Sequence, residues 1–153
     1  MGSTERSIFE RIQSDIEAID GTGSNNFDLS TSGQVRIGIA SEYTPGVSIF
    51  SAGNSTAQVG GVTRLNAYTR QIPITIEAVS TVTSDDPGEA LLSAWDIGAD
   101  IRRVLENDRS LGGITGIDDV EVEMVAVLHE QESTFAGLAL LQVLVKYTET
   151  AGA

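Results

Sequence analysis

The only histidine of the chain, His129, is the side chain best suited to move protons near neutral pH. It stands next to Glu130 in a segment that we expect to form a turn, where a histidine is usually solvated. A Ser–His–Asp triad would have to use this histidine, and no Gly-x-Ser-x-Gly elbow exposes a serine nucleophile. The sequence therefore points to no nucleophilic catalysis, and we expect a protein that is not an enzyme.

Acidic residues occur in close pairs, at Asp85/Asp86, Asp118/Asp119 and Glu121/Glu123. Two carboxylates share acid–base work only when burial or proximity separates their pKa values. These pairs fall at an expected helix start, a strand entry and a solvent-facing strand, where capping and solvation explain them. No EF-hand spacing accompanies them, so we expect neither a metal nor a cofactor.

Glycine-rich segments can cradle phosphate, but neither a Walker pattern nor Gly-x-Gly-x-x-Gly is present. The segment Gly113-Ile114-Thr115-Gly116 matches the short Gly-x-x-Gly of KH modules. It follows a helix in an acidic protein and contains no basic residue, so we take this match to be a coincidence.

Positive charge and an aromatic ring come together at Arg64, Tyr68 and Arg70, a grouping that could contact nucleic acid. In so acidic a chain, arginines pair more often with carboxylates, either within a subunit or between subunits. We therefore expect these three residues at a contact between subunits rather than on DNA.

The balance of charges narrows the possible partners. The chain has 153 residues, a formal net charge of −13 and no cysteine. A protein that grips nucleic acid or anionic lipid needs a basic patch, so we expect neither specific DNA binding nor membrane docking. A surface along which DNA slides without sticking stays compatible with this charge. Without cysteine, neither disulfides nor thiolate chemistry is possible, and the reducing cytoplasm is the simplest compartment.

Hydrophobic spacing predicts the elements that carry these residues. Isoleucines from Ile8 to Ile19 recur at helical spacing and predict an amphipathic helix, capped by Ser3 or Thr4 and stopped by Gly21. A second helix is predicted from Asp86-Pro87 to about Asn107. Gly98, inside this helix, would be explained by a close helix–sheet contact.

Alternating patterns predict strands at residues 35–39, 47–50, 64–82, 120–128 and 138–147. Pro73 cannot donate to a strand ladder, so its strand should lie at a sheet edge or carry a bulge there. The last strand is apolar on both faces and should be central. Long loops are expected at about 21–33 and 51–63, and a turn at 130–134. The order of elements predicts one α+β domain over residues 1–153, with two main helices on a mostly antiparallel sheet.

Several segments in order resemble a known family. They are an amphipathic helix from Ile8, Pro45-Gly46-Val47-Ser48-Ile49-Phe50, the run from Tyr68 to Glu77, a Pro-started helix with Leu91, Ile101 and Leu105, Leu111-Gly112-Gly113, an acidic strand, and a strand ending in Val145-Lys146-Tyr147-Thr148. This series is similar to the tail terminator and minor-tail proteins of long-tailed phages. The motifs are loose patterns that cover most of the chain from Ile8 to Thr148, and residues 21–40 fit them least.

The resemblance implies a structural virion protein of the tail or neck, assembled in the host cytoplasm. Proteins of this family form a hexameric ring that caps the tail tube, ends its polymerisation and meets the head-side connector. The expected partners are thus further copies of the chain, the tail tube protein and the connector or stopper protein. DNA would pass through an acidic lumen without specific binding.

We expect the long loop with Gly60 and Gly61, and the turn with Glu130, Gln131 and Glu132, to contact other subunits or partners. One alternative is another part of the same machine, such as a connector, stopper or tail tube subunit. A small-ligand-binding α+β domain is a second, and a plain adaptor a third. Saturable small-molecule binding would favour the ligand-binding domain.

Overall fold

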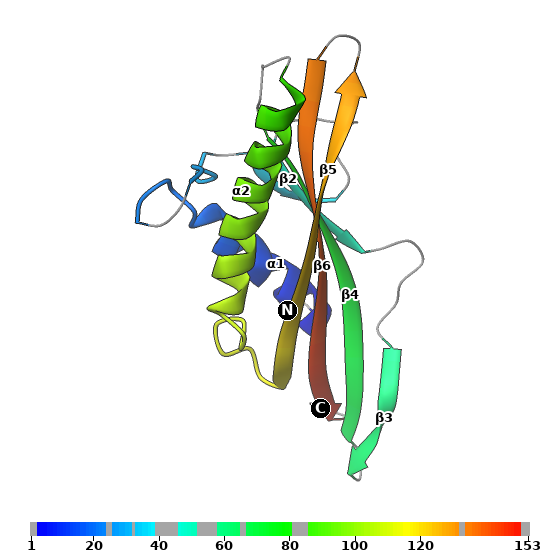
Figure 1. Ribbon diagram of the computed structural model, residues 1–153. Coiled ribbons are helices and arrows are strands. Elements are labelled where there is room, and N and C mark those ends of the chain that lie inside the picture. Colours follow the sequence, from blue (N-terminus) through cyan, green and yellow to red (C-terminus); the bar gives the residue numbers. More distant parts are fainter. Residues whose placement is uncertain are drawn as a thin grey trace.

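The computed structural model describes residues 3–23, 26–31, 33–38, 46–51, 58–64, 67–80, 86–131 and 134–150; at 58–64, 67, 129–131, 134 and 150 only the backbone is described. Helices α1 (Thr4–Glu17) and α2 (Pro87–Glu106) pack on one face of a six-stranded sheet (Figure 1). The chain is a single α+β domain, and the predicted fold class is confirmed.

The sheet has the order β1 (Val35–Ile37), β2 (Gly46–Ser51), β4 (Ala67–Val79), β6 (Thr134–Thr150) and β5 (Ile117–Gln131). A further strand, β3 (Gln58–Arg64), pairs with the first part of β4 on the side that β2 occupies farther along. The β1–β2 pair is parallel and every other pair is antiparallel. As expected from its two apolar faces, β6 is central.

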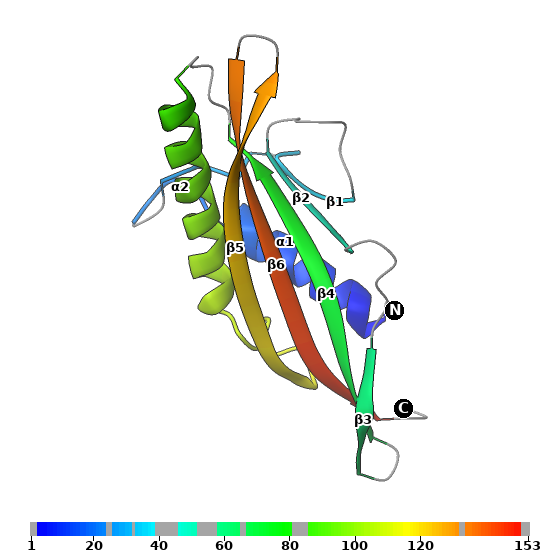
Figure 2. The same ribbon diagram turned by 45° about the vertical axis from the view of Figure 1, so that its right-hand side comes forward.

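The core lies between the helices and one face of the sheet. On α1, the isoleucines at helical spacing are fully buried: Ile8, Ile12 and Ile16. Alternate residues of β4 and β6 are buried in the same layer: Ile72, Ile74, Ile76, Ala78, Ala139, Leu141, Val143, Val145 and Tyr147. Helix α2 covers β5 and β6, and α1 packs beside α2 and against β1. Neither of the two described helices lies on the opposite face of the sheet (Figure 2).

Both helices begin where the sequence predicts. The Ser3 hydroxyl accepts a hydrogen bond from Arg6 N–H at 3.2 Å, and α1 ends at Glu17, before the predicted stop at Gly21. This early end has a physical reason, because the Ile19 carbonyl leaves the helix and accepts from Leu29 N–H at 2.7 Å. In α2, Asp86 is the N-cap and accepts from Gly88 N–H at 2.9 Å.

The predicted close contact at Gly98 is confirmed. A Cβ built there would overlap Met124 Sδ and lie 3.1 Å from Ala139 Cβ, so α2 approaches β5 and β6 through this glycine. The first turn of α2 comes equally close to β6 at Gly137, where a Cβ would overlap the Ala90 carbonyl. Glycine at these two positions lets helix and sheet backbones pack directly.

The edge position predicted from Pro73 is wrong for the strand as a whole, because β4 lies between β6 and the β2/β3 side. Pro73 nevertheless sits at a local break in pairing. On that side of β4, β2 pairing stops at Ile74 and β3 pairing begins at Gln71. Among the described residues, Pro73 has no strand partner on that side of β4, which suits a residue that has no N–H to donate.

The loop predicted at 51–63 is wrong for its second half, since residues 58–64 form β3. Pairing with β4, interrupted by irregularities between Val59 and Gly61 and between Val62 and Arg64, overrides the small polar composition of this segment. Residues 52–57 lie outside the described residues. The loop predicted at 21–33 is confirmed where it is described, with one isolated bridge between Asp20 and Asp28.

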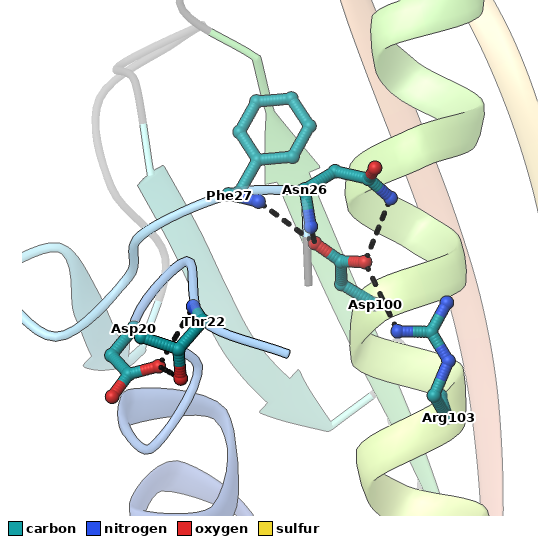
Figure 3. A network of polar contacts seen from close by, with 6 residues as sticks. All are labelled: Asp20, Thr22, Asn26, Phe27, Asp100 and Arg103. Carbon is teal, nitrogen blue, oxygen red and sulfur yellow. Dashed lines mark hydrogen bonds and ion pairs between the residues drawn. The ribbon is translucent and has the colours of Figure 1, made fainter. Parts of the chain in front are cut away.

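Asp100 anchors this loop to α2 (Figure 3). Its buried carboxylate accepts from Asn26 N–H at 2.7 Å, Phe27 N–H at 2.9 Å and Asn26 Nδ2 at 3.0 Å, with Arg103 Nη1 at 3.4 Å. Nearby, Asp20 accepts from the backbone and hydroxyl of Thr22. The segment after α1 is therefore held by side-chain acceptors rather than by regular structure.

Candidate assembly surface

The open face of the sheet is a mixture of carboxylates and apolar side chains. On β5 it presents Asp119, Glu121, Glu123 and Val125, the positions that alternate with the helix-facing Val120, Val122 and Met124. Strand β6 adds Lys146, Leu144, Gln142 and Leu140, which pair in this order with the four β5 residues, and β4 adds Pro73 opposite Leu144. An open face of this kind suits contact with other chains or with solvent.

Two of these carboxylates have a basic partner. Lys146 Nζ lies 2.9 Å from Glu121 Oε1, and Arg109 Nη2 lies 3.1 Å from Asp119 Oδ1. Glu123 forms no ion pair with the described residues. Beside it, a hollow of about 240 Å³ is lined by Pro73, Glu121, Glu123, Gln142, Val143 and Leu144. The face is thus acidic along β5 even after its internal ion pairs are counted.

The sheet has two different free edges in the described part of the chain. One is the outer edge of β5, which pairs only with β6 over its whole length. The other is formed by β1, which pairs only with β2, and by β3, which pairs only with β4. In Figure 1 the β5–β6 hairpin projects at one end of the domain, and the β3–β4 hairpin at the other. Each free edge presents backbone groups able to pair with another chain.

Exposed apolar side chains lie near these edges and on the outer side of α2: Ile37 46%, Leu92 63%, Trp95 43%, Val125 56% and Leu128 41% exposed. Trp95 is partly exposed because it lies on the flank of the helix, outside the row of Ala90, Ala94, Ile97 and Ile101 that faces the sheet. Of the exposed apolar side chains, Val125 and Leu128 lie on β5, whose outer edge is unpaired in the described residues.

The residues expected at a subunit contact are only partly brought together. The Arg70 guanidinium lies 5.9 Å from the Tyr68 ring centroid, and Arg70 Nε lies 2.8 Å from Glu149 Oε2 of β6. These three side chains lie on the helix-covered side of the sheet, beyond the end of the core. Arg64 lies at the end of β3. Arg70 is thus paired within its own chain, and its role between subunits stays a prediction.

The other expected contact residues lie in the two hairpins. Gly60 and Gly61 are within β3, with an irregularity in pairing between Val59 and Gly61. Glu130 and Gln131 are the last residues of β5 and pair with Phe135 and Thr134. The predicted turn is therefore shorter than 130–134, and Glu132 lies outside the described residues.

A pair of carboxyl groups that sequence reasoning missed joins α1 to the turn after α2. Arg11 Nε lies 3.2 Å from Asp15 Oδ1 and 3.0 Å from Asp108 Oδ2. Burial, together with the neighbouring Asp108, raises the pKa of Asp15 to about 7. The neighbouring Asp15, together with the Gly112 N–H and Arg11, lowers the pKa of Asp108. The signal in the sequence was Asp15 itself, an acid beside the buried isoleucines of α1.

A second buried group, Tyr147, closes the same helix against the sheet. Its hydroxyl donates to Glu5 Oε1 at 2.7 Å, and burial, helped by this hydrogen bond, raises its pKa. Together with the Asp15 pair, it fixes both ends of α1. Both arrangements hold α1 on the sheet, so a structural role explains them.

The remaining acidic pairs have the simple roles that we expected. Asp86 caps α2, Asp118 accepts from the Thr148 hydroxyl at 2.8 Å, and Glu121 and Glu123 are exposed on β5. In the described ranges, no three acidic or histidine side chains are grouped as metal ligands would be. None of the helices described is long and apolar enough to cross a membrane.

The described residues therefore present two unlike sheet edges, an open face that is acidic along β5, and five exposed large apolar side chains. No protein-family model and no curated protein matches the chain.

Proposed function

We propose that this chain is a structural protein of a phage tail that assembles into a closed, hexameric ring on the end of the tail tube. The ring ends tube polymerisation and offers its other side to the head-side connector. Its acidic lumen lets DNA pass. The ring size and the tail come from the resemblance of the sequence to tail terminator proteins.

The observation that carries the proposal is the presence of two different free edges on one sheet. When two different surfaces of the same chain bind each other, the growing oligomer keeps one free surface of each kind at its two ends. Subunits add until the rotation between neighbours brings these ends together and closes a ring. A chain with only one surface that binds itself would stop at a dimer. Two unlike edges are thus the minimum that a ring requires.

The charge supports a passage for DNA. With a net charge of −13, the surface repels a phosphate backbone rather than binding it. A ring whose inner wall includes Glu121 and Glu123 would present carboxylates to passing DNA without holding it. The hairpins at the two ends of the domain are suited to contact the tube on one side and the connector on the other.

The test combines the mass of the chain in solution with binding to tail tubes. Light scattering over a concentration series should give a discrete ring, and negative-stain images should show a central hole. Added to purified tail tubes, the protein should sit at one end and stop elongation. Long open tubes would instead assign the chain as a tube subunit, and a monomer that ignores tubes at every concentration would refute the proposal.

A further inference from the structure

We draw no further inference here: the strongest candidate, the outer edge of β5 that pairs with no described strand and carries the exposed Val125 and Leu128, supports no proposal because nothing in the structure shows what covers it.

Discussion

Gly137 of β6 lies directly beneath the carbonyl of Ala90 in the first turn of α2, closer than any Cβ would permit. The Ser80 hydroxyl donates to the Gly137 carbonyl at 3.3 Å, and Ser80 N–H donates to it at 3.0 Å. The start of α2, the end of β4 and β6 are thereby locked together at one point. This point lies where the β5–β6 hairpin leaves the helix-covered part of the sheet.

Gly137→Ala should lower the free energy of unfolding by about 2 kcal/mol, because the obstructing atom is backbone and cannot turn aside. Gly98→Ala is the matched comparison. Its new methyl group meets the flexible Met124 side chain, and alanine gains about 1 kcal/mol of helix propensity, so its net effect should be much smaller. Urea denaturation of both variants measures the difference. Equal losses in the free energy of unfolding would mean that the contact between α2 and β6 at Gly137 is not tight.

Asp15 should make stability depend on pH in an unusual direction. Its folded-state pKa is raised to about 7, so the folded chain holds a proton that the unfolded chain releases at lower pH. The contribution of Asp15 to stability is therefore highest below the unfolded pKa of about 4 and falls by up to about 1.4 kcal/mol per pH unit as pH rises toward 7. Asp15→Asn should remove this fall and be more stable than wild type at pH 8.

Asp20→Asn is the contrasting control for this pH dependence. Hydrogen bonds from Thr22 lower the pKa of Asp20, so its contribution is present at neutral pH and is lost as pH falls through the folded pKa. Thermal unfolding between pH 2 and pH 8 should thus show the effect of Asp20→Asn on the pH slope only below about pH 4, and that of Asp15→Asn only above it. An Asp15→Asn variant whose stability falls between pH 4 and pH 7 as steeply as that of wild type would contradict the raised pKa of Asp15.

Asp100→Ala should destabilise the domain strongly, by about 3 kcal/mol or more, because it leaves the amides of Asn26 and Phe27 without their acceptor. Asp100→Asn keeps one acceptor oxygen and should lose less. Hydrogen exchange provides a local readout, since the Asn26 and Phe27 amides should lose protection before those of β6. Unchanged exchange at both amides would contradict the anchoring role.

The sequence was informative where local chemistry and hydrophobic spacing agreed. Asp86-Pro87 marked the start of α2, the all-apolar pattern of β6 placed that strand in the centre, and Gly98 predicted a close contact. Each of these signals depends on a few adjacent residues. They could be interpreted without knowing which helices and strands pack together.

Features that depend on distant pairing were missed. Strand β3 contains Gly60 and Gly61 and has little intrinsic strand propensity, so only its register with β4 identifies it. Pro73 suggested an edge, and no local signal could show that β2 and β3 share one side of β4 with a gap between them. In the sequence, Asp15 and Asp100 are ordinary acidic residues of predicted helices. Only the fold places Asp108 beside Asp15 and the Asn26 segment beside Asp100.

A paired substitution distinguishes two roles for Arg70, an ion pair within its own chain and a contact with a neighbouring subunit. Arg70 Nε and Glu149 Oε2 lie 2.8 Å apart with both side chains about one-third exposed, so Arg70→Glu should cost about 1 kcal/mol of stability. The swap Arg70→Glu/Glu149→Arg restores opposite charges within the chain while leaving its net charge unchanged. If Arg70 acts within its own subunit, the swap should recover both the unfolding midpoint and the ring. If Arg70 also binds a neighbouring subunit, the swap should recover stability but not association, and light scattering on the folded variant distinguishes the two.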